Sequence, residues 1–298
     1  MDNQLSSLIK LIESLKQKIN DNQTIKNISK EFVEVEINSK KFLPNISFKS
    51  SLLNQNMLKN RYCNILANES TRFKLNYENK SDYINANWIN PSNLLDKPNY
   101  IATQGPIVTY LDDFWKMVWL SDSSIIICLA KEVEKFPKFD IYWNDKKSMN
   151  FGEFNVSVTA SHNKFNELII RDILLTNTLN GEIKKITQYH YLGWPDHSVP
   201  SNISHFAKII NETLALDGPF IVHCSAGVGR TGVFIVVRSI IEEIFKKIKN
   251  NQDVDDEIDL RNLLCSIRKQ RYEMVQSEEQ YEFCYLAILH ILENYLII

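Results

Sequence analysis

The chain has 298 residues and a formal net charge of −2, with 44% hydrophobic and 23% charged residues. This length suits one large α/β domain, and the even mixture of charges argues against nucleic-acid binding and against attraction to an anionic membrane. We expect a soluble protein without membrane insertion, because Arg238 interrupts the longest apolar run and Met1–Gln4 does not begin a signal peptide.

The first predicted element is an amphipathic helix. From Leu5 to Ile19 apolar residues recur at helical spacing, and we expect this stripe to dock on the domain behind it rather than on a partner or a membrane. The polar stretch between about Asn20 and Lys41 permits a linker. We therefore divide the chain into an N-terminal helical segment with a linker, residues 1–40, and a main domain, residues 41–298.

Downstream, short β-type runs alternate with helical patterns. Apolar runs predict buried strands at Ser124–Leu129 and Pro219–Val222, and more exposed antiparallel strands at Asn155–Thr159 and Glu167–Leu174. Helical periodicity predicts helices at Leu111–Leu120, Ser204–Leu216, Gly229–Lys249, Ile258–Lys269 and Glu278–Tyr295. The expected fold class is α/β, with a highly twisted mixed sheet flanked by helices on both faces.

The most informative stretch is HCSAGVGRTG at residues 223–232, between a predicted central strand and a predicted helix. A strand, a glycine-bearing loop and a helix N-terminus turn backbone N–H groups into an anion cradle. Cys224 should ionise readily beside these groups and act as a nucleophile. Arg230 can offer two parallel donors to phosphoryl oxygens, and the Thr231 hydroxyl can donate to the sulfur when it leaves.

This stretch resembles the signature loop of the protein tyrosine phosphatases, which hydrolyse phosphotyrosine through a phosphocysteine intermediate. The resemblance makes residues 41–298 the catalytic domain. It implies a supporting role for His223 and substrate binding by the loop, namely by Ser225, Ala226, Gly227, Val228 and Gly229.

Trp194-Pro195-Asp196-His197-Ser198-Val199-Pro200 resembles the family's general-acid loop, although Ser198 stands where glycine is common. The resemblance implies that Asp196 is the acid and later the base, with support from Trp194. A proton donor is required there, because phosphoryl transfer to the cysteine leaves a phenolate.

Three further resemblances complete the predicted site. Lys59–Tyr62 is similar to the substrate-recognition loop, in which Tyr62 would stack on the substrate ring and make the pocket too deep for phosphoserine. Residues 276–280 are similar to the glutamine loop, in which Gln276 would orient the attacking water and Gln280 would bind substrate. Glu134 and Lys138 resemble an acid and base of another loop, and Glu134 would hold the Arg230 fork.

Three positions depart from the family pattern. Asn64 replaces a common aspartate, so it can still accept a bond from the substrate backbone but without charge assistance. Cys63 replaces an often basic residue, which implies less preference for acidic flanks. Glu273 is a bulky acid near the rim, which argues against doubly phosphorylated substrates.

Two alternative functions compete with an active phosphotyrosine phosphatase. A catalytically weak phosphotyrosine-binding module would lack a chemical group, and the sequence shows no such loss. A dual-specificity or phosphoinositide phosphatase would favour basic residues in the loop, whereas Ser225, Ala226 and Val228 are neutral.

The cysteines are odd in number and have no paired metal-ligand spacing: Cys63, Cys128, Cys224, Cys265 and Cys284. This usage suits a reducing compartment. We expect a cytoplasmic monomer that acts on phosphotyrosine-containing proteins. No metal or other cofactor is expected, because loop N–H groups and Arg230 can meet the phosphoryl charge.

Overall fold

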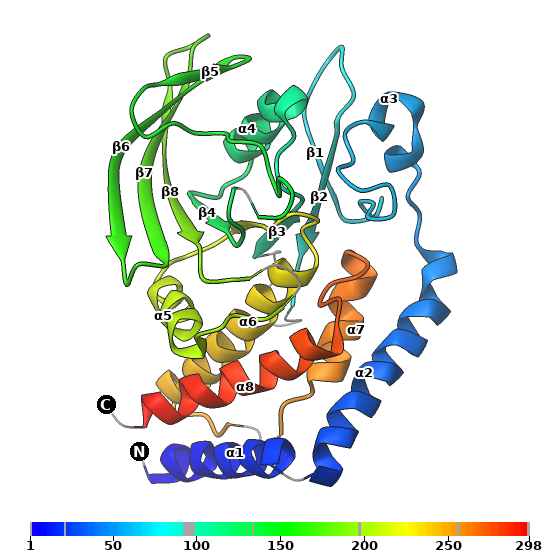
Figure 1. Cartoon of the computed structure of the whole chain (residues 1–298), viewed down its shortest axis with the longest axis vertical. Coiled ribbons are helices and arrows are strands. Elements are labelled where there is room, and N and C mark those ends of the chain that lie inside the picture. The colour runs from blue at the N-terminus through cyan, green and yellow to red at the C-terminus, as the bar shows by residue number, and fades with distance from the viewer. Residues whose placement is uncertain are drawn as a thin grey trace.

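A mixed nine-stranded sheet forms the centre of the computed structural model, in the order β1-β2-β3-β9-β4-β8-β7-β6-β5 (Figure 1). The structure describes residues 2–20, 22–91, 99–132, 134–195, 198–254 and 257–296, and only the backbone of residues 2, 3, 20 and 22–26. The strands are β1 Arg72–Lys74, β2 Tyr83–Ile89, β3 Tyr100–Thr103, β4 Ile125–Cys128, β5 Met149–Phe151, β6 Phe154–Lys164, β7 Leu168–Asn177, β8 Ile183–Tyr191 and β9 Phe220–His223.

The four strands at the centre of the sheet run parallel. β9 pairs with β3 on one side and with β4 on the other, and β4 pairs in parallel with β8. Every residue of β3, β4 and β9 is buried, as expected for parallel strands covered on both faces. The outer pairs are antiparallel, and they include β6 and β7, which cover the two strands predicted to be antiparallel. The prediction of a mixed α/β sheet is confirmed.

Helices cover the sheet and gather below it in the view of Figure 1. α4 Leu111–Leu120 contacts β5 and β6, while α5 Ile203–Leu214 and α8 Glu278–Tyr295 pack with α6 Gly229–Lys249. α7 Leu260–Gln270 contacts β2. Short helices occupy η1 Leu43–Asn45, η2 Ser50–Leu52, α3 Asn54–Met57 and η3 Val108–Tyr110. The five helices predicted downstream of residue 110 are thus present, with ends shifted by at most two residues.

The N-terminal segment folds onto the domain as two helices, α1 Asp2–Asn20 and α2 Asn22–Phe42. α1 buries Leu8, Leu11, Ile12 and Leu15 and packs against α8, as the amphipathic pattern predicts, while Leu5 and Ile9 remain exposed.

The stretch for which the composition permitted a linker is instead largely α2. Its apolar residues Ile28, Phe32 and Val35 are buried against the domain, and α2 contacts both α7 and α8. Packing of this face stabilises a helix that its polar composition alone did not indicate.

Candidate active site

The loop between β9 and α6 surrounds Cys224, whose side chain is almost buried. The Thr231 hydroxyl donates to Cys224 Sγ at 3.3 Å. Gly227 has φ of +72°, and a Cβ on it would lie 2.1 Å from the carbonyl oxygen of Thr103. Both facts require glycine at this position, so the loop can approach β3 this closely only because residue 227 lacks a side chain.

Arg271, which was not predicted from the sequence, also supports this loop. Its buried guanidinium donates from Nε to the carbonyl of Gly227 at 2.8 Å and from Nη2 to that of Ala226 at 3.0 Å. Nη1 and Nη2 also donate to Asn87 Oδ1 at 2.7 Å and Asn85 Oδ1 at 2.8 Å. Burial lowers the pKa of Arg271 to about 10, so it stays protonated near neutrality.

His223 is a buried, neutral link between the sheet and the loop. Burial lowers the pKa of its imidazole to about 3. Its Nδ1 lies 3.2 Å from the carbonyl oxygen of Cys224, so this nitrogen carries the proton. Nε2 therefore accepts from the Tyr142 hydroxyl at 2.7 Å, and that hydroxyl accepts from Gln188 Nε2 at 2.8 Å. The chain of bonds fixes the backbone at Cys224.

Arg230 pairs with Glu134, as the resemblance implied. Arg230 Nη1 lies 2.6 Å from Glu134 Oε1, and Nη2 lies 2.9 Å from Oε2. Lys138 Nζ lies 3.6 Å from Glu134 Oε2. The Glu134 carboxylate thus forms ion pairs with both Arg230 and Lys138. Its two bonds to Arg230 set the plane of the guanidinium beside the loop.

The predicted general-acid loop contacts Arg230 through its backbone. Arg230 Nη2 donates to the carbonyl of Pro195 at 3.3 Å, and Trp194 Nε1 donates to the carbonyl of Ser198 at 2.7 Å. The Trp194 ring is buried against Phe206. Asp196 itself lies outside the described residues.

Tyr62 stands at the side of the loop, where its hydroxyl lies 2.8 Å from Ser225 Oγ. Tyr62 is 38% exposed. The preceding residue, Arg61, holds this segment by donating to the carbonyls of Gly105 at 3.1 Å and Pro106 at 2.7 Å. Asn64 lies exposed two residues after Tyr62.

Gln276 and Gln280 meet at the start of α6. The backbone N–H of Gln276 donates to Gln280 Oε1 at 2.9 Å. A Cβ on Gly229 would lie 3.0 Å from both Gln276 Oε1 and Gln280 Nε2. Both amides therefore lie against the phosphate-binding loop, and any side chain at residue 229 would disturb them.

Together, the described residues bring several of the predicted side chains to the loop that holds Cys224. Cys224 lies beside Thr231, the Tyr62 hydroxyl reaches Ser225 in the same loop, and Gln276 touches the Gly229 position. Such an arrangement can hold an anion next to a nucleophile.

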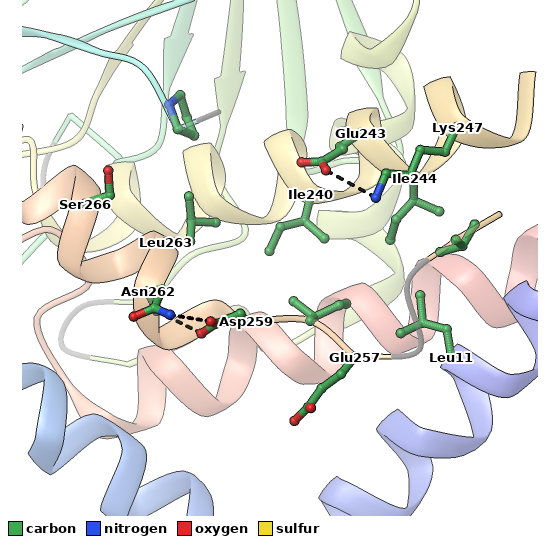
Figure 2. Close-up of a pocket in the computed structure, with 13 residues that line it drawn as sticks. Leu11, Ile240, Glu243, Ile244, Lys247, Glu257, Asp259, Asn262, Leu263 and Ser266 are labelled. Carbon is green, nitrogen blue, oxygen red and sulfur yellow. Dashed lines mark hydrogen bonds and ion pairs between the residues drawn. The ribbon is translucent and has the colours of Figure 1, made fainter. Parts of the chain in front are cut away.

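Figure 2 shows a separate pocket of about 510 Å³ between α1, α6 and α7. Its lining includes Leu263 of α7 and Ile240 and Ile244 of α6. The two isoleucines lie in the half of α6 that is farther from the cysteine loop. Its polar groups have local partners: Asp259 caps α7 by accepting from the N–H of Asn262 at 3.0 Å. This pocket is not the candidate active site.

The part of the chain that the structure describes contains no group of three or more His, Cys, Asp or Glu side chains that could hold a metal ion. No helix there is both long enough and apolar enough to span a membrane.

Comparisons with known proteins agree with this geometry. The sequence profile of the family described as protein-tyrosine phosphatase matches residues 56–290. Tyrosine-protein phosphatase 2 of Dictyostelium discoideum is 32% identical in an alignment 304 residues long. The alignment covers 81% of this chain and 79% of the relative. Tyrosine-protein phosphatase non-receptor type 20 of Rattus norvegicus is 36% identical over 275 residues, which cover 91% of this chain and 62% of the relative.

A solved structure is also similar over most of its length. The catalytic domain of human protein tyrosine phosphatase non-receptor type 18 superimposes with a TM-score of 0.82 at 29% identity, covering 91% of this chain and 98% of that one. Profile, relatives and fold lead to the same conclusion as the cysteine loop. The chain belongs to the protein-tyrosine phosphatase family, and it is a hydrolase acting on phosphotyrosine.

Proposed function

We propose that the chain dephosphorylates phosphotyrosine in proteins in two steps, with Cys224 as the nucleophile. Cys224 Sγ attacks phosphorus, the bond from phosphorus to the tyrosine oxygen breaks, and Asp196 protonates the departing phenolate. Water then attacks the phosphocysteine, Asp196 takes its proton, and the sulfur–phosphorus bond breaks. The observation that carries this proposal is the hydroxyl of Thr231 at 3.3 Å from Sγ, where it can donate to the leaving sulfur.

The phosphoryl charge is met by backbone N–H groups of residues 225–229 and by Arg230. Glu134 supports this assignment because its carboxylate, paired with both Nη atoms, fixes where the guanidinium lies. Lys138 and His223 act as supporting residues. We assign Gln276 to orienting the attacking water, since its amide lies against the Gly229 position.

The substrate class follows from Tyr62 and its neighbours. An exposed tyrosine ring bonded to Ser225 would form one wall of a deep pocket, which suits phosphotyrosine. Asn64 would accept a backbone N–H of the substrate peptide and Gln280 would line the pocket, while Trp194 supports the general-acid loop. With Cys63 beside Tyr62, we expect little preference for acidic flanking residues.

The broader assignments are parts of the same proposal. We assign the catalytic domain to residues 41–298, with residues 1–40 as an N-terminal addition. The protein acts as a cytoplasmic monomer on phosphotyrosine-containing proteins, without nucleic acid, metal or other cofactor. Size-exclusion chromatography with light scattering tests the monomer, and activity in the presence of a chelator tests the metal.

The decisive experiment compares Cys224→Ser with Cys63→Ser, an exposed cysteine that serves as the matched control. Turnover of a phosphotyrosine peptide should vanish in the first variant and remain in the second. Acid quenching of the unchanged enzyme during turnover, followed by intact-mass measurement, should show one phosphoryl group on Cys224. Retained turnover in Cys224→Ser would overturn the mechanism.

Relative turnover separates the substrate classes. We expect cleavage of phosphotyrosine peptides and little cleavage of matched phosphothreonine peptides or of a phosphoinositide. Faster turnover of either of the latter would replace the proposed substrate. Tight binding of the phosphotyrosine peptide without phosphate release would make the protein a binding module.

A further inference from the structure

Helix α2 is linked to the loop that precedes Gln276 by a buried residue, Arg268 of α7. Arg268 is 2% exposed, and it donates from Nε to the carbonyl of Met274 at 2.8 Å and from Nη2 to that of Val275 at 2.6 Å. Its Nη1 faces α2, where it pairs with Glu36 Oε1 at 2.6 Å and lies 3.2 Å from Ser39 Oγ.

The loop that Arg268 holds has an unusual backbone. Glu273 has φ of +68° and Val275 has φ of +56°, in a region that favours glycine. A β-branched residue at such a φ persists only where its surroundings hold it. The N–H of Val275 donates to the carbonyl of Val228 in the cysteine loop at 3.0 Å, and the carbonyl of Val275 binds Arg268.

Other contacts fix α2 at this place. Glu31 accepts from the Tyr285 hydroxyl at 2.8 Å and from the Tyr281 hydroxyl at 3.1 Å, and Lys18 of α1 pairs with Glu31 at 2.7 Å. Figure 1 shows α2 running beside α7, and α2 also contacts α8. The Glu36 carboxylate is thus presented to Arg268 by a helix with its own anchors.

We propose that Glu36 is a positioning residue for phosphocysteine hydrolysis, acting through Arg268 and the carbonyls of Met274 and Val275 on Gln276. This inference rests on the proposed function, in which Gln276 orients the attacking water. The cysteine loop has its own support from Arg271, which binds the carbonyls of Gly227 and Ala226, in addition to its bond with Val275. Loss of the Glu36 carboxylate therefore slows the second step more than the first.

A second ion pair on the same helix provides a matched control. Glu34 Oε2 pairs with Arg261 Nη1 of α7 at 2.6 Å, at the exposed surface. Glu34→Gln therefore removes one carboxylate from α2 and one ion pair with α7, as Glu36→Gln does, without touching the residue that holds Met274 and Val275.

The experiment measures the fraction of enzyme present as phosphocysteine during steady-state turnover of p-nitrophenyl phosphate, by acid quenching and intact-mass measurement. In Glu36→Gln we expect kcat to fall about tenfold and the phosphoenzyme fraction to rise, because small displacements of a positioned group are costly. Glu34→Gln should match the unchanged enzyme in both quantities, and thermal melting of both variants checks that they are folded.

Two results would overturn the inference. One is that both kcat and the phosphoenzyme fraction are unchanged in Glu36→Gln, and the other is a lower kcat without accumulation, which indicates only a structural role. Gln276→Ala separates these failures from failure of the proposed function. If Gln276→Ala accumulates phosphoenzyme and Glu36→Gln does not, only the inference fails. If Gln276→Ala shows no accumulation, the role assigned to Gln276 fails.

Discussion

Arg230 and Glu134 form a two-bonded pair in which each terminal nitrogen of the guanidinium meets its own carboxylate oxygen, at 2.6 and 2.9 Å. The sequence predicted that Arg230 would offer a fork to the phosphate. In the structure the Nη1 and Nη2 atoms contact Glu134, so the carboxylate determines how the guanidinium faces an incoming phosphoryl group.

Replacing Glu134 by glutamine should therefore lower kcat/KM for a phosphotyrosine peptide about 10- to 100-fold, because the guanidinium loses its charged partner and its fixed plane. Steady-state kinetics measures this, with Glu132→Gln from the same segment as the control. Equal losses in both variants would contradict the assignment.

Asp196→Asn should slow turnover about 10²- to 10⁴-fold, the usual contribution of a positioned proton donor. The loss should grow as the leaving group becomes more basic, so phenyl phosphate is affected more than p-nitrophenyl phosphate. A series of aryl phosphates checks this, and the exposed Asp217→Asn is the control. A loss that is independent of the leaving group would exclude Asp196 as the acid.

Gly227→Ala and Gly181→Ala separate backbone strain from steric conflict. Both glycines have positive φ, +72° and +77°, so each change should cost roughly 1 kcal/mol of folding free energy. At Gly227 the new Cβ would also meet the backbone of Thr103, which adds about 1–3 kcal/mol, whereas Gly181 has open space around it. Urea unfolding measures both, and equal destabilisation would contradict the predicted conflict.

Two buried histidines should make stability depend on pH. Burial lowers the pKa of His223 to about 3 and that of His190 to about 4, from an ordinary value of 6.5. Below pH 6.5 the unfolded chain binds protons that these folded imidazoles do not. The free energy of unfolding therefore decreases by about 1.4 kcal/mol for each histidine with every unit by which the pH is lowered. Above pH 6.5 this contribution is constant.

His190→Gln should remove one histidine's share of that slope between pH 6.5 and about 4. His162→Gln, at an exposed position, is the control. Urea unfolding across this pH range gives the answer, and an unaltered slope in His190→Gln would refute it.

Hydrogen peroxide should inactivate the enzyme reversibly. A sulfur–oxygen bond forms on the Cys224 thiolate, the peroxide bond breaks and water leaves, and added thiol then restores the enzyme. Activity should fall to near zero, Cys63→Ser should behave like the unchanged protein, and inorganic phosphate should protect. Activity that survives mild peroxide would contradict oxidation of Cys224.

The site could be predicted where chemistry is concentrated in contiguous sequence. Residues 223–232 hold the nucleophile, the glycines and the arginine in one loop, so the strand, the loop and helix α6 were predicted together. Arg271 was missed because its four acceptors belong to residues 85, 87, 226 and 227, which only the fold brings together. No spacing in the sequence links these positions.

The fold was predicted less completely where polar residues are buried. β8 was not predicted, since Gln188 and His190 interrupt its apolar pattern, and both are satisfied by distant groups, Tyr142 and Ala130. α2 was not predicted because its composition is polar, and its Glu31 and Glu36 find partners more than two hundred residues away. Tertiary contacts override local composition in both elements.

The buried guanidinium of Arg271 has a consequence for how quickly catalysis can begin. Because Arg271 is part of the protein, its bonds to the carbonyls of Gly227 and Ala226 shape the receptor for the substrate's dianion without any contribution from the substrate. Little reorganisation energy then remains for the moment of encounter, and discrimination among phosphoproteins falls to the surfaces around the opening.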